Sequence, residues 1–399
     1  MSEILVLSNG HGEDLSGSLL SKELIKRGHK VDALPLVGNG NDYKNEKINI
    51  IVQTKEFKTG GLGYTSLKGR LQELIDGQII YLLNKLLLVF SIRKKYDYFL
   101  VVGDIVPILF AWLSKKKSFV YLVAYSSHYE GKLKLPWPCG YFLRSSKIKK
   151  IYSRDLLTSI DLSNQLQREI NFFGNPFMDK FLIPNKKSKE ITFNIAFLPG
   201  SRLPELENNF ALMLDLLQTL SKYKYFDSVE FNFALINSFK RDRIIRILKK
   251  RKWLFSKNKS YLNNLFFEFK FIKVRFKSNY FEQILINSNL VVSMAGTASE
   301  QAIGLSKPVI QMEGLGPQFT KSFAEAQRRL LGKNVYCATE YNNKQDQIDQ
   351  TIGLILKVIY FIKLDKNFLL ACHENSINRL GTKGASKKII KDIDSLLNS

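Results

Sequence analysis

The feature that most constrains the fold is a regular alternation of short apolar runs with longer segments of helical periodicity. This alternation is typical of βαβ units, which build mostly parallel sheets, so the sequence predicts an α/β protein. In chain order, the runs interpreted as strands are 4–8, 31–37, 98–104 and 118–125, then a second series that begins at Asn194 and continues with 229–236, 289–294, 308–312 and 334–338.

The two series of strands are separated by residues 183–189, which are polar, contain a proline and show no periodicity. We interpret this stretch as a linker between two Rossmann-like domains with parallel sheets that face a central cleft. The predicted domains are 1–182 and 190–380. Residues 385–397 have helical periodicity, and we expect the segment 381–399 to close the fold.

The charge and the cysteine content limit the ligands and the kinds of scaffold that are compatible with this sequence. Lys and Arg number 60 against 36 Asp and Glu, a net charge of +24 that favours phosphorylated ligands, polyanions or an anionic membrane surface, although it is in part a Lys-rich bias. The three cysteines, Cys139, Cys337 and Cys372, lie far apart, which argues against a disulfide scaffold or a zinc ribbon.

The N-terminus does not resemble a signal peptide, and no apolar segment is long enough to span a bilayer. We therefore expect a cytoplasmic protein that is soluble or, at most, peripheral at the inner face of the membrane.

A glycine-containing turn at residues 8–17 is the first candidate site. Gly10 and Gly12 would let backbone amides approach a ligand, but the third glycine of a dinucleotide fingerprint falls on Leu15, so that interpretation fails. His11 could act as a general base at neutral pH, or it could simply cap backbone groups.

Asp104 is the second candidate, because it ends an otherwise apolar strand. Ligands of open α/β sheets bind at the carboxyl ends of strands, where Asp104 could accept a proton from a sugar hydroxyl or orient His11. The alternative is a helix N-cap, since an apolar helix follows and Asp is favoured at that position.

The turn Leu198-Pro-Gly-Ser-Arg202 is the third candidate and suits a phosphate. Backbone amides at Gly200, the Ser201 hydroxyl and the Arg202 guanidinium can converge there, ahead of a helix that we expect to run to about residue 220.

The fourth candidate, residues 293–302, is again a strand followed by a glycine turn and the start of a helix. Gly296 and Thr297 can cradle a phosphate, and Glu300 or Gln301, one helical turn later, can reach ribose hydroxyls.

The last two motifs, in this order and at this distance, resemble those of glycosyltransferases of the GT-B fold, in particular the lipid-A-disaccharide synthase family. That family's second domain begins after a G-[HN]-P…D segment, similar to Gly174–Asp179 here, and continues with L-P-G-S-R, present as Leu198–Arg202. Its later S-G-T-A…E…P pattern is similar to Ala295–Ala298 followed by Pro308. The C-terminal half carries the resemblance, and the first half matches only in outline.

The resemblance implies transfer of a sugar from a nucleotide-sugar, expected to be UDP-linked, to a hydroxyl of a lipid or lipid-like acceptor. It implies no metal site and no cofactor. Asp104 falls where the family has its catalytic aspartate, and Asp104 or His11 would deprotonate the acceptor. The loop with Gly10, Gly12 and Glu13 lies where the family has its acceptor-side loop, and it also resembles a loop of the related N-acetylglucosamine transferase of peptidoglycan synthesis.

The chain departs from the family at the donor side. The ribose-binding glutamate of the family falls on Gln301, with Glu300 one place early, and a neutral glutamine changes the preference for the nucleotide. Gln318 is similar to the glutamine by which GT-B enzymes hold donor-sugar hydroxyls. Two alternatives therefore stay open: a nucleotide-sugar epimerase, or a non-catalytic protein that binds nucleotide-sugars or membranes.

Two further segments bear on partners. Residues 77–95 predict an apolar helix with a basic end, which could lie in a membrane interface beside a lipid acceptor or be buried in the first domain. Residues 240–259 hold ten Lys or Arg and one Asp; they could contact anionic lipid headgroups or RNA, or form a solvated helix face. No nucleic-acid partner is expected.

Overall fold

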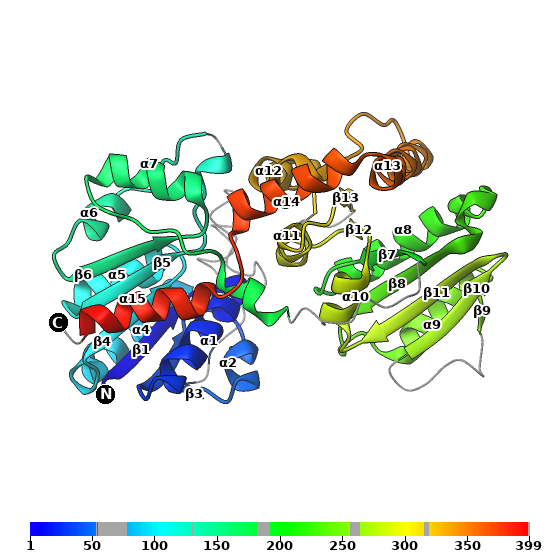
Figure 1. The fold of residues 1–399 in the computed structure, drawn as a ribbon. Helices are drawn as coiled ribbons and strands as arrows, with labels where there is room; N and C mark the ends of the chain where they lie inside the picture. Colours follow the sequence, from blue (N-terminus) through cyan, green and yellow to red (C-terminus); the bar gives the residue numbers. More distant parts are fainter. Residues whose placement is uncertain are drawn as a thin grey trace. The chain divides into compact units, whose positions relative to one another are not determined.

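The computed structural model describes residues 1–52, 54, 78–129, 131–181, 192–255, 264–314 and 319–397, apart from the side chains of His11 and Gln78. The chain divides into two compact units (Figure 1). The first unit consists of Met1–Asp179 and Leu380–Ser399, and the second of Lys180–Arg379. The segment interpreted as a linker, 183–189, lies outside the described residues.

The first unit is built on a parallel six-stranded sheet in the order β3-β2-β1-β4-β5-β6. The strands are β1 (Glu3–Ser8), β2 (Lys30–Pro35), β3 (Asn49–Ile50), β4 (Tyr98–Val102), β5 (Lys117–Leu122) and β6 (Ile148–Ser153). The helices are α1 (His11–Lys26), α2 (Asn41–Asn45), α4 (Gln78–Ile92), α5 (Ile105–Ser114), α6 (Cys139–Leu143), α7 (Leu156–Leu166) and α15 (Ala385–Leu397), with short 3-10 turns η2 (Arg93–Lys95), η3 (Ser127–Tyr129) and η4 (Pro176–Lys180).

Both faces of this sheet are covered, which explains why its central strands are continuous apolar runs. Leu5 and Leu7 of β1 belong to a core with residues of α4, α5, α6 and α7. Ile4 and Val6, which point to the opposite face, belong to a second core with residues of α1 and α15. The prediction of an α/β protein with parallel sheets is confirmed.

The second unit is built on an eight-stranded sheet in the order β14-β13-β12-β7-β8-β11-β10-β9, parallel except for the antiparallel β11-β10-β9 end. The strands are β7 (Phe193–Leu198), β8 (Val229–Leu235), β9 (Leu254–Phe255), β10 (Asn264–Phe269), β11 (Ile272–Ser278), β12 (Leu290–Ser293), β13 (Val309–Gln311) and β14 (Val335–Cys337). The helices are α8 (Glu205–Leu220), α9 (Arg241–Lys250), α10 (Phe281–Asn287), α11 (Thr297–Gly304), α12 (Lys321–Leu331), α13 (Lys344–Leu364) and α14 (Lys366–Leu380), with 3-10 turns η5 (Lys224–Ser228) and η7 (Gly332–Asn334).

Glycines bring the C-terminal segment back to the first unit, after the chain has completed the second. Gly174 has φ +102°, and a Cβ there would lie 2.7 Å from the carbonyl oxygen of Thr382. Gly381 has φ +74°, and its Cβ would lie 2.4 Å from the Cα of Gly174. The two backbones therefore approach so closely that only glycine fits at either position.

Asp179, at the end of the same Gly174–Asp179 motif, holds the start of α15. Its carboxylate accepts hydrogen bonds from the backbone N–H groups of Gly384, at 2.6 Å, and Ser386, at 2.8 Å. Gly174 and Asp179 of the motif, together with Gly381, thus account for the docking of the C-terminal helix.

Candidate functional site

Asp104 lies at the carboxyl edge of the first sheet, where strands β1 and β4 pair side by side. It is the N-cap of α5: its Oδ1 accepts a hydrogen bond from the backbone N–H of Val106 at 2.9 Å. The Asn9 side-chain amide, which follows β1, donates to both carboxylate oxygens at 3.1 and 3.0 Å. The N-cap interpretation is therefore confirmed, and the same bonds fix the carboxylate at the edge where open α/β sheets bind ligands.

Glu13 is the neighbour of Asp104 at this edge. It lies in the first turn of α1, so close to two glycines that a Cβ on Gly10 would be 2.7 Å from its Oε2 and one on Gly103 would be 3.2 Å from its Cγ. Burial, and then the charge of Asp104, raise the pKa of Glu13 to about 8. Burial also raises the pKa of Asp104, against the opposing hydrogen bonds from Val106 and Asn9. Glu13 thus keeps its proton at neutral pH beside a second carboxylate, an arrangement suited to acid–base chemistry.

The turn before Glu13 is shorter than predicted. Helix α1 begins at His11, and the Asp14 N–H already donates to the carbonyl of Gly10 at 2.8 Å, so Gly12 is helical as well. The acids in this first turn complement the positive end of the helix dipole, which favours an early start. His11 is therefore the first helical residue and not part of an open loop; its role as a base stays a prediction.

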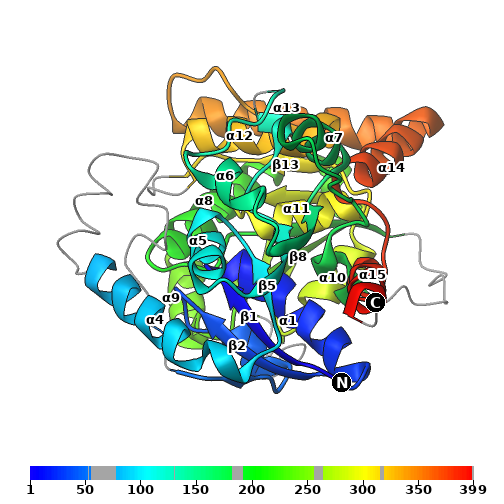
Figure 2. The same ribbon diagram turned by 90° about the vertical axis from the view of Figure 1, so that its left-hand side faces the viewer.

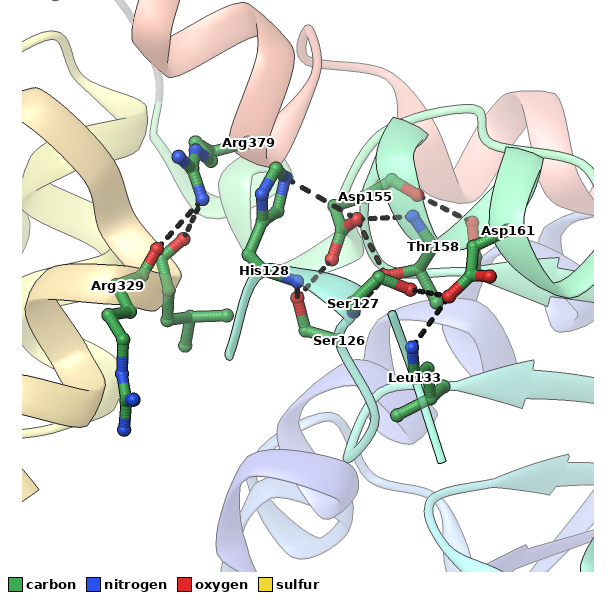
Figure 3. A network of polar contacts seen from close by, with 11 residues as sticks. Ser126, Ser127, His128, Leu133, Asp155, Thr158, Asp161, Arg329 and Arg379 are labelled. Atoms are coloured by element: carbon green, nitrogen blue, oxygen red, sulfur yellow. Dashed lines mark hydrogen bonds and ion pairs between the residues drawn. The ribbon is translucent and has the colours of Figure 1, made fainter. Parts of the chain in front are cut away.

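A histidine that the sequence analysis missed lies at the same edge (Figure 3). The Nε2 of His128 is 3.6 Å from the Oδ1 of the buried Asp155, and the His128 backbone N–H donates to the Ser126 hydroxyl, which in turn donates to Asp155. The preceding Tyr125 hydroxyl accepts a hydrogen bond from the N–H of Ile105, at the start of the helix that Asp104 caps. His128 thus lies in the loop after β5, beside the loop of Asp104 after β4, and its partner Asp155 follows the next strand, β6, as the N-cap of α7.

The two predicted phosphate turns of the second unit lie together. The first follows β7 and the second follows β12, and these strands pair in parallel, so both turns are at one edge. Gly200 has φ +98°, and a Cβ there would lie 3.1 Å from the carbonyl oxygen of Met294. Ser201 is exposed and Arg202 half-buried beside it. On the second turn, Gly296 is the N-cap of α11 and Thr297 its first residue.

A third turn, which follows β13 and contains Gly314, lies close to the Gly200 turn, and both contact Asn209. A Cβ on Gly314 would lie 2.5 Å from the Asn209 Oδ1, while the Asn209 amide donates to the carbonyl of Pro199 at 3.0 Å. Asn209 Oδ1 is buried and has no hydrogen-bond partner among the described residues. The Gly200 and Gly314 turns therefore meet at one buried amide, that of Asn209, which the sequence analysis did not single out.

The predicted ribose contacts are less accessible. Glu300 and Gln301 lie in α11 and are 9% and 5% exposed. Gln318 lies outside the described residues. Contacts of these three side chains with a donor stay predictions.

A cavity of about 330 Å³ opens at the carboxyl ends of β8 and β11, in the second unit. It is lined by Leu235, Asn237, Phe239, Arg241, Ile244, Leu265, Phe276, Ser278 and Asn279. Because β8 pairs in parallel with β7, the cavity lies at the same sheet edge as the glycine turns. Polar groups make up more of its exposed lining than apolar groups do.

Among the described residues, no group of His, Cys, Asp or Glu could hold a metal ion. In that same part of the chain, no helix combines the length and apolarity needed to cross a membrane.

No family model and no curated protein sequence matches this chain. Solved structures do match over nearly the whole length. The spinosyn rhamnosyltransferase SpnG with thymidine diphosphate matches with a TM-score of 0.59 at 13% identity, covering 99% of this chain and 100% of the other. MnaA of S. aureus with UDP gives 0.57 at 13%, covering 100% and 97%. The UDP-GlcNAc 2-epimerase of Neisseria meningitidis bound to UDP-GlcNAc gives 0.56 at 15%, covering 100% of both chains.

At these identities the matches show the fold: two Rossmann-like α/β domains of GT-B architecture, as predicted. The neighbours are enzymes, a glycosyltransferase and epimerases. Membership of the lipid-A-disaccharide synthase family stays a resemblance.

Proposed function

We propose that this protein is a glycosyltransferase that transfers a sugar from a nucleotide-sugar, UDP-linked by preference, to a hydroxyl of a lipid or lipid-like acceptor without a metal. The observation that carries the proposal is the gathering of the Gly200 and Gly296 turns at one sheet edge of the second unit. Each precedes a helix, so backbone amides and two helix N-termini are available to one diphosphate. Structural neighbours that hold UDP, thymidine diphosphate or UDP-GlcNAc support this choice.

On the donor side, the proposal assigns the diphosphate to Gly200, Ser201, Arg202, Gly296 and Thr297. Arg202 would stabilise the negative charge that develops on the departing diphosphate. The cavity beside these turns, with Asn237 and Ser278 in its wall, has room for part of the nucleoside. Glu300, Gln301 and Gln318 stay assigned to the sugar and ribose hydroxyls.

On the acceptor side, the proposal assigns proton transfer to the edge of the first sheet. Asp104 is the favoured base and His11 the alternative. Protonated Glu13 can donate a hydrogen bond to a substrate oxygen, because its raised pKa keeps the proton near neutral pH. His128, held beside Asp155, adds a further group of suitable chemistry.

Epimerisation of a nucleotide-sugar is the second candidate function. It is favoured by the neighbouring epimerases and by the two adjacent carboxyl groups, Glu13 and Asp104, of which one keeps its proton. The two reactions differ in their needs, because an epimerase converts UDP-GlcNAc alone, whereas a transferase requires an acceptor. Proton NMR of UDP-GlcNAc incubated with the protein separates them.

Donor binding can be tested by thermal shift with UDP, UDP-GlcNAc and thymidine diphosphate. A ligand at 100 times its dissociation constant should stabilise the protein by about 2.7 kcal/mol. Arg202→Ala should weaken binding by about 1.5–3 kcal/mol, the range for charged hydrogen bonds, with the fold intact. Arg246→Ala, an exposed arginine on α9, is the matched control and should bind as the unmodified protein does. Equal affinity in the two variants would reject the donor site.

A further inference from the structure

Helix α4 leaves an apolar face exposed. Its inner side packs into the core through Val89, with Leu82 and Leu86 partly buried beside it. On its outer side, Ile80 and Leu87 are 67% and 66% exposed, and Ile79 and Leu83 lie on the same face, exposed by about half. Contiguous exposed apolar side chains on one face of a helix mark an interaction surface, in contrast to single exposed residues.

The exposed apolar surface continues onto α6. Helix α5 packs against both α4 and α6, so the three helices lie in a row on one face of the first sheet (Figure 2). Before and on α6, Trp137 is 91% exposed and Tyr141 66% exposed. The Tyr141 ring contacts Trp112 of α5 with 5.9 Å between ring centroids. Tryptophan and tyrosine are the residues enriched where proteins meet the headgroup level of a bilayer.

The segments that form this face are basic, although Asp32 pairs with Lys95 and Asp161 accepts a hydrogen bond from the backbone N–H of Leu133. Residues 78–95, 105–117 and 131–147, which contain α4, α5 and α6, include no Asp or Glu, whereas they hold four, three and four Lys or Arg. Lys94 and Lys134 are exposed among them. In the whole chain the two signs are mixed, 60 basic against 36 acidic residues, so the absence of acid here is local.

We infer that the outer face of α4, α5 and α6 docks on an anionic lipid bilayer, with Ile80, Leu83, Leu87 and Trp137 in the interface and the lysines at the headgroups. Basic residues around apolar side chains suit an anionic bilayer, because the apolar side chains can insert among acyl chains and the cations can pair with headgroup phosphates. RNA would leave the isoleucine and leucines without an apolar partner. The inference extends the lipid side of the proposed function, but its readout needs no donor, so either can fail without the other.

Sedimentation with vesicles tests the inference on the full chain. The protein should pellet with vesicles of phosphatidylserine and phosphatidylcholine, and far less with phosphatidylcholine alone. Ile80→Ser/Leu87→Ser should weaken binding tenfold or more, from the apolar surface removed. Lys94→Gln/Lys134→Gln should weaken it by about fivefold for each charge and only with the anionic vesicles.

Matched pairs on the second unit serve as controls. Tyr360→Ser/Leu364→Ser removes side chains of similar exposure from α13, and Lys249→Gln/Lys250→Gln removes two exposed lysines from α9. Both should bind vesicles as the unmodified protein does, and circular dichroism should show all four variants folded. Failure of the unmodified protein to pellet, equal binding to both vesicle types, or equal loss in test and control pairs would each overturn the inference.

Discussion

Single side chains decide how the first unit responds to pH, and Glu13 is the clearest case. Its pKa rises from 4.5 to about 8 on folding, so between these values the folded state binds the proton more tightly than the unfolded chain. The stability that this proton provides is therefore full at low pH and is lost as the pH rises through about 8. Asp14, whose pKa burial also raises to about 8, acts in the same direction.

We accordingly expect Glu13→Gln to match the unmodified protein in stability near pH 5 and to exceed it by about 1–3 kcal/mol near pH 9. Denaturant unfolding at both pH values measures this difference. Glu325→Gln, an exposed glutamate of α12, is the control and should leave the pH dependence unchanged. Parallel stability curves for the Glu13 variant and the unmodified protein would show that Glu13 titrates normally.

Residue-level contacts were also the hardest part of the site to predict. The sequence marks Asp104 and the glycine turn because each follows an apolar run. It does not show that Asn9 and Asp104, 95 positions apart, form hydrogen bonds, because that depends on the pairing of β1 with β4. Asp155 could not be identified from the sequence for a related reason, because β6, the strand before it, lacks the continuous apolar run that predicts a strand.

At the scale of elements, the strands that form continuous apolar runs were predicted to within about three residues, whereas half-exposed strands such as β6 and β11 were missed. The edge strand β6 reads Ile-Lys-Lys-Ile-Tyr-Ser, and β11 reads Ile-Lys-Val-Arg-Phe-Lys-Ser, with lysines or arginines toward solvent. Such alternation lacks the continuous apolar run on which the prediction depended. The basic segment 240–259 predicts, as one of its alternatives, a solvated helix face. In its described part, α9 buries Ile244 and Leu248 while its charges point outward; residues 256–259 lie outside the described residues.

Helix α1 supplies a test of packing between elements. A Cβ on Gly17 would lie 2.0 Å from the hydroxyl of Tyr43, which donates to Ser8, and Ser8 donates in turn to the buried Asp14. Gly17→Ala should therefore displace Tyr43 and destabilise the protein by about 1–3 kcal/mol, although alanine favours helices.

The matched control for this prediction is Gly353→Ala in α13, where a Cβ meets nothing within 4 Å. There the higher helix propensity should act alone and stabilise the protein by about 0.5–1 kcal/mol. Thermal unfolding compares the two. A stabilising Gly17→Ala would contradict the packing that we describe, and Gly17→Ala combined with Tyr43→Phe should recover part of the loss.

At the scale of the whole molecule, the chain leaves the first unit after Asp179 and returns to it at Leu380. Two parallel-sheet domains could be expected from the two series of apolar runs. The return of the chain to the first unit could not be expected from the sequence. The helical periodicity at 385–397 predicts a helix, but it does not indicate which sheet that helix covers. The contacts that decide this are made by Asp179, some 205 positions earlier in the chain.

Asp179→Ala should consequently act on one unit alone. The substitution leaves the N–H groups of Gly384 and Ser386 without their acceptor, which costs about 0.5–2 kcal/mol as the loss of a helix cap. Because α15 packs in the core of the first unit, hydrogen exchange should accelerate in β1 and β4 and stay unchanged in β7 and β12. Asp365→Ala is the counterpart in the second unit, where Asp365 accepts from the N–H groups of Asn367 and Phe368 at the start of α14. It should leave β1 and β4 unchanged, so acceleration of the same peptides by both substitutions would show that the two units do not unfold separately.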